Sequence, residues 1–514
     1  MRTQKSLKNM FFGIVLQLVM AGIGIVNRTV MIRYIGIQAL SLNGLFTEVL
    51  AMLSLAELGV GSAITYSLYE PLATKNYNQI SRLMNLFQKA YRFVAISILG
   101  IGLFLIPFIQ YIVNSVSYPI SYIRFIFILF VIQTASSYLF SYKTALITAD
   151  QKQYVISIIT TVSKLIMAGI QIAVIVFTKD YVLYLINSIA FTFGTNIVIA
   201  IVANRLYPFL DKREKLDKKK QQEIFSNIKN VFVSKISGTI TNSTDNTLIS
   251  VLVSTIAVGY YSNYATIINI IKGFLTQFTN AITASFGNLL VSESKEYCDT
   301  VLRRVTYITF VFGGVCATGL DCALSNLIEL WLGKEFLLDD FTVFICILCL
   351  YVNIIRTPLW TVLEISGLFK ENRNTGVLGS VINLIVSVVL GRKWGMAGIF
   401  LGTICTYVVQ GILKIYYLYT RKLGLSALPF YRDTGMYIFI VLVQCLVAKF
   451  ICVHVKMDNM VLTFIVNCCV AVAVSVLFDI LPFVMTERFR YCLKLGKSFI
   501  SKKSAKREIM NNEN

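Results

Sequence analysis

Four of the basic side chains inside long apolar runs are candidate ligand-binding groups, because an ionisable group there costs about 2.5–3.5 kcal/mol to insert into a bilayer. They are Arg28, Lys235, Lys272 and Arg356. Arg356 stands two positions before Pro358. Few acidic residues are available in the same runs to neutralise them. Ammonium and guanidinium groups make strong charge-assisted hydrogen bonds to phosphate oxygens. The residue types therefore predict a binding site for an anionic group, and pyrophosphate suits it well.

Polar residues accompany these bases on matching helix faces. Gln17, Gly24 and Arg28 fall within about 40° of one another at the helical period. The residues that stand 218 positions later, in the seventh apolar run, are Lys235, Asn242 and Asn246. Matching stripes predict that the first helix of each of two halves lines a shared cavity. The alternative is that these groups only satisfy one another between packed helices.

Two acids, Asp245 and Glu57, also lie within apolar runs. One interpretation is that they pair with the bases when no substrate is bound. The other is that they bind a proton or Na⁺ that drives a transport cycle. The spacing of these residues does not separate the two interpretations.

The sequence offers no set of catalytic residues. It has one His, no Walker loop and no glycine run that would cradle a phosphate. Cys346 and Cys349 form a Cys-x-x-Cys pair, but no second pair or neighbouring His accompanies it. We interpret these cysteines as small apolar residues within a span rather than zinc ligands. Neither an enzyme nor a cofactor or metal site is predicted.

The elements that must position these residues are transmembrane helices. Of the 514 residues, 56% are apolar and 14% are charged, which is more apolar surface than a soluble domain hides. The apolar runs reach 20 residues or so, enough to cross about 30 Å of hydrocarbon. We predict an all-α polytopic membrane protein with about 14 spans, near 10–34, 40–68, 86–111, 120–147, 154–177, 182–206, 228–254, 258–290, 304–332, 340–366, 376–393, 396–420, 434–456 and 459–482.

An internal repeat organises these spans. A shift of 218 positions aligns the first six spans with the next six, and 62–67 matches 280–285 at four of six positions. Repeats of an even number of spans run parallel, an arrangement typical of alternating-access transporters with the substrate site between the halves. The predicted parts are a six-helix lobe at 1–210, a basic linker at 211–226, a second six-helix lobe at 227–422, two further helices at 423–484 and a basic tail at 485–514.

The net charge of +21 comes mostly from short connectors, and the basic residues gather in alternate ones. This is the pattern of the positive-inside rule, so we predict that both termini are cytoplasmic and that no nucleic acid is bound. The basic tail either lies on anionic lipid or is solvated.

Several segments resemble bacterial polysaccharide (Wzx-type) flippases of the multidrug/oligosaccharidyl-lipid/polysaccharide exporter (MOP) superfamily. They are residues 55–64, 66–73, 245–250, 258–264 and 366–370, and the resemblance extends over about 1–480. It implies two six-helix lobes, here with two additional helices, around a cationic cavity. Such flippases move undecaprenyl-pyrophosphate-linked oligosaccharide repeat units from the cytoplasmic to the outer leaflet of the plasma membrane, for capsule, O-antigen or exopolysaccharide synthesis. Membrane lipids, a polymerase and other assembly proteins would then be partners.

The resemblance also implies basic residues on helices one, two, seven and eight, as in related lipid flippases. Arg28, Lys235 and Lys272 lie on three of these helices, whereas the second span offers Glu57 and no base. Three alternatives stay open. A multidrug/cation antiporter expects acids that face the cavity, an oligosaccharide polymerase or ligase expects a long outer loop, and a lipid II flippase expects more Arg in the first two spans.

Overall fold

The computed structural model describes residues 2–54, 60–210, 244–455, 457–491 and 493, and all regular elements in these segments are helices. The predicted site residues Glu57, Lys235 and Asn242 lie outside the described residues, as do the predicted linker 211–226 and most of the tail. Gln17 belongs to helix α1 by its backbone, but its side chain is outside the description.

The chain forms two compact units, which are described separately. The first comprises Met1–Thr266 and Gly376–Ile399, and the second comprises Ile267–Thr375 and Phe400–Asn514. The helices before α13 are α1 (Arg2–Tyr34), α2 (Ile37–Leu53), α3 (Val60–Ala73), α4 (Tyr77–Leu105), α5 (Ile109–Ile112), α6 (Ile120–Tyr138), α7 (Ser141–Ala149), α8 (Gln153–Thr178), α9 (Tyr181–Leu206), α11 (Asp245–Leu252) and α12 (Thr255–Ser292). They are followed by α13 (Lys295–Leu332), α14 (Asp340–Ile365), α15 (Phe369–Tyr417), α16 (Leu428–His454) and α17 (Met460–Ser475). The predicted lobe boundaries stay a prediction.

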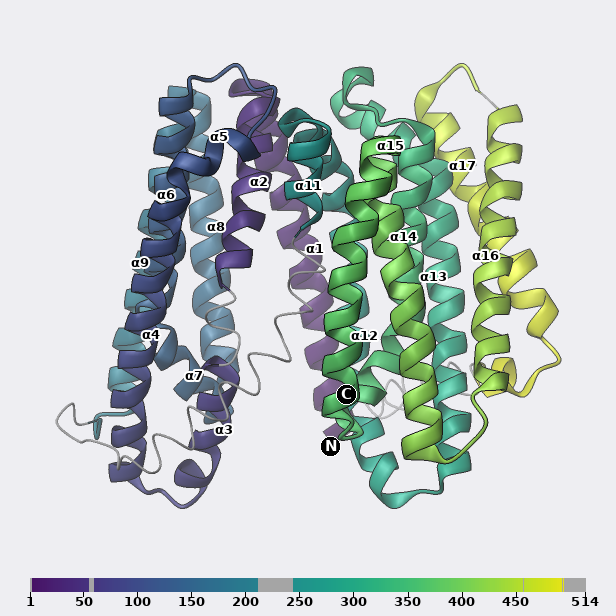
Figure 1. Ribbon diagram of the computed structural model, residues 1–514, viewed down its shortest axis with the longest axis horizontal. Coiled ribbons are helices and arrows are strands. Elements are labelled where there is room, and N and C mark those ends of the chain that lie inside the picture. The colour runs from purple at the N-terminus through teal and green to yellow at the C-terminus, as the bar shows by residue number, and fades with distance from the viewer. Residues whose placement is uncertain (1, 55–59, 211–243, 456, 492, 494–514) are drawn as a thin grey trace, which may run out of the picture. The chain divides into compact units, whose positions relative to one another are not determined.

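In the first unit, helices α4, α6, α8 and α9 pack side by side, and α1 packs against α8 (Figure 1). Apolar and aromatic side chains fill the spaces between them. Phe46 of α2 meets Phe127 and Phe130 of α6 edge-on, with ring centroids 5.1 and 5.8 Å apart. These contacts hold α2 against α6, which positions the polar side chains that α2 carries.

In the second unit, α13 lies at the centre and packs against α14, α16 and α17 (Figure 1). Phe310 of α13 stacks on Tyr437 of α16 with ring centroids 4.3 Å apart. Tyr307 and Phe483 complete this aromatic layer. Helix α17 continues into a π-helical segment, η5 (Val476–Ile480), and a 3₁₀ turn, η6 (Leu481–Phe483).

Short polar caps begin many of the helices. Asp180 accepts a hydrogen bond from the amide of Val182 at 2.7 Å, and Asp339 accepts one from the amide of Thr342 at 2.8 Å. Such side chains satisfy amides that the first turn of a helix leaves unpaired. Because these side chains satisfy the first amides, a helix can begin directly after its connector, and the connector can be short.

Helix α15 contains a sharp kink. Trp394 and Gly395 have non-helical backbone angles, and Gly395 has a positive φ of 57°. A side chain at Gly398 would collide with the backbone of Leu390. Glycine permits both the positive φ and the close approach. The kink falls at the predicted boundary between spans 376–393 and 396–420.

The described residues contain nine helical stretches that are long and apolar enough to cross a membrane. They are Tyr77–Ile112, Ile120–Ala149, Gln153–Thr178, Tyr181–Leu206, Lys295–Leu332, Asp340–Ile365, Lys370–Leu423, Leu428–His454 and Met460–Phe483. Large apolar side chains on them point outward, among them Phe93, Phe177 and Phe450, which are 72%, 85% and 66% exposed. Water does not favour so much exposed apolar surface, whereas lipid does. The protein is an all-helical, multi-pass membrane protein.

Candidate functional site

Arg28 of α1 donates three hydrogen bonds to one face of α12. Its Nε lies 2.6 Å from Oδ1 of Asn263, its Nη1 lies 3.0 Å from Oγ1 of Thr266, and its Nη2 donates to Ser262. All three acceptors are uncharged. No carboxylate of the described residues forms an ion pair with Arg28, so its guanidinium group is held in place with its charge not neutralised.

Asn27, the neighbouring residue, joins a second set of neutral groups. Its Nδ2 donates to Oε1 of Gln171 on α8 at 2.9 Å, and Nε2 of Gln171 donates to the hydroxyl of Ser188 on α9 at 2.6 Å. Gln171 is 2% exposed. The chain of hydrogen bonds therefore fixes three helices around one polar point inside the first unit.

This point is in the wall of a cavity of about 500 Å³. The lining residues come from α1, α2, α6, α8 and α9, and the polar ones are Asn27, Asn43, Thr47, Ser54, Gln133, Thr134, Ser137, Gln171, Tyr184, Ser188 and Thr192. A second cavity of about 400 Å³ shares Ser137, Met167 and Thr192 with it and carries Lys164 as its one charged residue. Amide and hydroxyl groups donate and accept hydrogen bonds without a net charge, which suits a neutral polyhydroxyl ligand.

Arg356 of α14 lies between two aromatic rings in the second unit. Its guanidinium carbon is 3.6 Å from the ring centroid of Tyr407 and 4.8 Å from that of Trp360. Lys414, only 4% exposed, places its ammonium group 4.2 Å from the centroid of the same Trp360. Aromatic faces attract cations, so Trp360 and Tyr407 stabilise two positive charges without cancelling them.

Arg356 and its two aromatic neighbours, but not Lys414, border a cavity of about 190 Å³ in the second unit that is otherwise mostly apolar. Its walls include Arg356, Trp360 and Tyr407 together with Leu359 and Ile412. In the described part of the chain no acid makes an ion pair with either cation, although Glu364 attracts Lys414 electrostatically. The arrangement suits an amphiphile whose anionic group meets Arg356 and whose apolar portion meets the aliphatic walls.

Two other predicted site residues have less enclosed positions. Lys272 is exposed on α12, and its ammonium group bonds to none of the described residues. Asp245 is the first residue of α11, where a negative charge favours the helix dipole. Glu48 of α2, a residue for which we made no prediction, accepts the amide of Asn246 at 3.2 Å. The carboxylates of Asp245 and Glu48 therefore both interact with the N-terminal end of α11.

Sequence patterns predicted Arg28 and Arg356 but not the groups that hold them. Asn263 and Tyr407 carry no charge and reach Arg28 and Arg356 from other helices, and Trp360 stands one turn after Arg356 on α14 itself. A polar or aromatic residue in an apolar run is too common to single out. For the buried Lys414, a snorkelling position near the interface is an equally good interpretation of the sequence.

Comparison with known proteins identifies the fold. No protein-family model and no curated protein sequence matches the chain. Among solved structures, the inward closed conformation of the lipid II flippase MurJ matches with a TM-score of 0.66 at 13% identity, covering 92% of this chain and 97% of MurJ. The inward-facing conformation of a multidrug resistance MATE transporter of the MOP superfamily matches with a TM-score of 0.62 at 12% identity, covering 80% and 98%. A mutant of the Vibrio cholerae MATE transporter VcmN matches with a TM-score of 0.54 at 14% identity, covering 82% and 98%.

By their descriptions, these solved proteins are a flippase and transporters. At these identities the likeness concerns the fold alone. The chain has the fold that these solved structures share.

Proposed function

We propose that the chain is a flippase that moves undecaprenyl-pyrophosphate-linked oligosaccharide repeat units across the plasma membrane by alternating access. The observation that carries the proposal is that three basic side chains within its helices are held by neutral groups of the described residues. Among the described residues, Arg28 bonds only to neutral oxygens, and Arg356 and Lys414 lie against aromatic rings. A cation kept at membrane depth without a described acid is costly and is typical of a substrate site. Phosphate supplies the missing negative charge.

The remaining chemistry of the substrate has matching surfaces. The neutral, amide- and hydroxyl-lined cavity of the first unit suits sugar hydroxyls. As the sequence predicts, the proposed substrate-binding residues are Arg28, Lys235, Lys272, Arg356, Asn242 and Gln17. Glu57 and Asp245 are proposed as acids that pair with the bases at rest or couple an ion.

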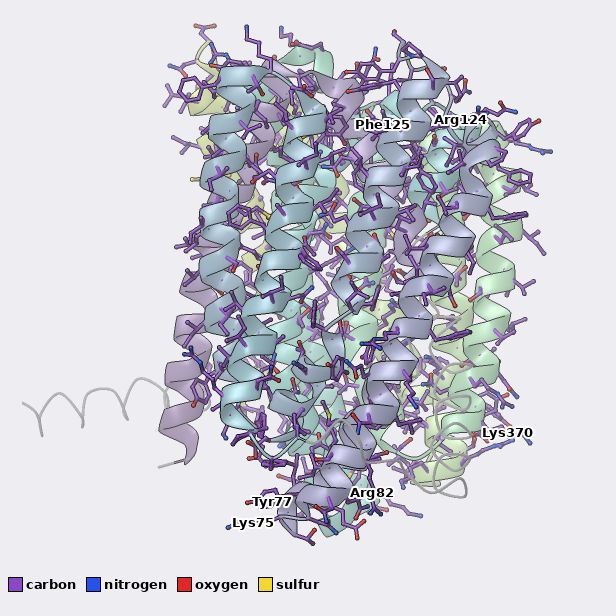
Figure 2. The ribbon with its side chains drawn as sticks, turned by 90° about the vertical axis from the view of Figure 1, so that its left-hand side faces the viewer. Lys75, Tyr77, Arg82, Arg124, Phe125 and Lys370 are labelled. Carbon is purple, nitrogen blue, oxygen red and sulfur yellow. The ribbon has the colours of Figure 1, made fainter. Side chains whose placement is uncertain are left out.

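The proposed orientation places both termini in the cytoplasm. In the first unit, Lys75, Tyr77 and Arg82 lie at one end of the helices, and Arg124 and Phe125 lie at the opposite end (Figure 2). Lys75 lies in the connector between α3 and α4 and Arg82 lies in the second turn of α4, and charge bias assigns this end of the helices to the cytoplasm. On this proposal the sugars enter from that side and leave at the end where Arg124 lies, to be used by a polymerase and other assembly proteins.

Binding of undecaprenyl pyrophosphate to the purified full chain in lipid nanodiscs tests the proposal. We expect Arg28→Gln and Arg356→Gln each to weaken binding about tenfold or more, because a hydrogen bond to a charged group contributes about 1.5–3 kcal/mol. Arg33→Gln is the matched control, since Arg33 is an exposed arginine in the last turn of the same helix α1. In cells, the same two substitutions should abolish surface polysaccharide without lowering the amount of protein.

Two other ligands separate the alternatives. Lipid II in place of undecaprenyl pyrophosphate tests a role like that of MurJ, and a lipophilic cation such as ethidium tests a role like that of the MATE transporters. Ethidium that binds more tightly than undecaprenyl pyrophosphate would overturn the proposal. So would a wild-type affinity for undecaprenyl pyrophosphate in both variants.

A further inference from the structure

A second polar centre lies in the second unit, among the helices that follow the predicted repeat. Asp479 in the π-helical segment η5 is 0% exposed, and Gln444 of α16 beside it is also 0% exposed. Neither residue belongs to the cavities described above. A fully buried acid within a membrane-spanning helix is expensive and calls for a physical explanation.

The amide nitrogen of Gln444 lies at the centre of a ring of oxygens. Nε2 is 3.0 Å from the carbonyl oxygen of Gly314, 2.6 Å from Oγ1 of Thr318, 3.2 Å from Oγ of Ser475 and 3.3 Å from Oδ2 of Asp479. These partners come from α13, α17 and η5. One side chain of α16 therefore links three other segments, and its NH₂ group already donates toward the carboxyl group.

Gln444 and Asp479 each have one side-chain oxygen that accepts no hydrogen bond from the described residues. Within the described residues, Oε1 of Gln444 and Oδ1 of Asp479 have no hydrogen-bond partner. An amide oxygen and an ionised carboxylate oxygen only accept hydrogen bonds, so the two cannot satisfy each other without a proton. Buried polar atoms are otherwise almost always paired. A proton on Oδ1 would make that oxygen a donor, and Oε1 is the free acceptor on the side chain that already bonds to Oδ2 through Nε2.

The local backbone is built to admit the carboxyl group. A side chain at Gly314 of α13 would collide with Oδ2 of Asp479, so the glycine leaves room for the acid against the helix. The hydroxyl of Tyr307 donates to the main-chain oxygen of Asp479 at 3.1 Å, which holds the π-helical turn. Single π-helical turns inside α-helices occur frequently at functional sites.

The surroundings supply no positive charge for an ionised Asp479 among the residues that the structure describes. The basic groups at this interface belong to other pairs: Arg303 and Arg488 bond to Asp433 at 3.0 and 2.5 Å, and Lys449 lies 3.3 Å from Asp340. Of the titratable groups on the packed elements, Tyr351 on α14 and Cys445 on α16 interact electrostatically with Asp479, and the hydroxyl of Tyr307 on α13 bonds to its main-chain oxygen. Each of these groups is either neutral or negatively charged, so none of them would compensate the negative charge of an ionised Asp479.

We propose that Asp479 and Gln444 form a proton-binding site, in which H⁺ from water binds Oδ1 of Asp479 and is shared with Oε1 of Gln444. The bound proton keeps α13, α16 and η5 together. Loss of the proton leaves a buried carboxylate, which favours separation of η5 from α13. The site thereby couples proton binding to the packing of the two last helices, independently of the identity of the substrate.

Infrared difference spectroscopy of the purified full chain in nanodiscs tests the site. At pH 7 the ionised form of a free aspartate outnumbers its acid form about 1,000-fold. We nevertheless expect a carbonyl band of a protonated carboxylic acid that shifts in D₂O, is lost in Asp479→Asn and moves in frequency in Gln444→Ala. Asp340→Asn, an identical substitution at an exposed acid paired with Lys449, should leave the band unchanged.

The thermal stability of the same proteins gives a second measurement. If the folded chain holds a proton that the unfolded chain has lost, stability falls as the pH rises. The Tm of the wild type should therefore decrease from pH 5 to pH 9 by more than that of Asp479→Asn, whose amide donates to Gln444 at every pH. Identical spectra of the wild type and Asp479→Asn would overturn the proposal. So would a carboxylate band that responds to Na⁺ instead of pH, since this would indicate a cation site.

Discussion

Substitution of Arg356 by methionine should separate its effect on stability from its effect on binding. An arginine at membrane depth costs about 2.5–3.5 kcal/mol on insertion scales. The cation–π contacts to Tyr407 and Trp360 return up to about 2 kcal/mol each when desolvated. The two terms nearly cancel, and methionine fills the same space with apolar atoms. We expect the free energy of unfolding to change by no more than about 1 kcal/mol.

Binding of undecaprenyl pyrophosphate should respond differently. The lost charge-assisted hydrogen bonds contribute about 1.5–3 kcal/mol, which corresponds to roughly 10- to 100-fold weaker binding. Thermal unfolding and ligand binding in nanodiscs measure the two effects on the same sample. Lys449→Met is the matched control. Because Lys449 pairs with Asp340, this variant should be less stable than the wild type but should bind the ligand equally tightly.

The reasoning fails if Arg356→Met unfolds the protein or leaves its affinity unchanged. Strong destabilisation would mean that the arginine is a structural support for α14 and α15. Unchanged affinity would mean that the cavity of the second unit does not receive the anionic group. Arg356→Lys adds a further check, since it retains the charge but loses the planar fork, and should show an intermediate affinity.

Two further substitutions test the architecture. Gly398→Ala should destabilise the protein by more than about 1 kcal/mol, because the new methyl group meets the backbone of Leu390 in the kink of α15; a Tm equal to that of the wild type would show that the kink can open. Gln171→Leu should cost about 1–2 kcal/mol, because hydrogen bonds between membrane helices contribute about 0.6 kcal/mol on average and Asn27 would lose its partner. Denaturant unfolding measures this loss, and a stabilised variant would contradict the assigned network.

The helices were predictable from the sequence to a greater extent than the site. Apolar runs mark helices because each span must satisfy its own backbone in lipid, and even the break at Gly395 coincided with a predicted boundary. The predicted span 40–68 corresponds to α2 and α3 with residues 55–59 outside the described segments. The start of α13 at Lys295 lies nine residues before the predicted span, because a polar helical turn outside the lipid carries no apolar signal.

The site depended on contacts between helices, which sequence spacing does not contain. Arg28 was identified from its charge, but its three acceptors on α12 are neutral and lie more than 230 positions away. Asp479 stands three residues before the end of the predicted span 459–482, where an acid usually faces the interface. Its complete burial follows from the π-helical turn and from Gly314, and neither has a pattern that identifies it in advance.

In the described part of the chain, Arg28, Arg356 and Lys414 are all held by neutral groups and not by carboxylates. Arg28 is positioned by amide and hydroxyl oxygens, and Arg356 and Lys414 are positioned by aromatic faces. A carboxylate partner would hold a base more strongly, but it would also occupy the donors and compete with any anionic ligand. Neutral acceptors and aromatic rings lose less interaction energy than a carboxylate when a phosphate binds. The basic side chains therefore stay ordered and available to the ligand. This difference is what separates these cations from Arg303 and Lys449, which already have acids and have a structural role.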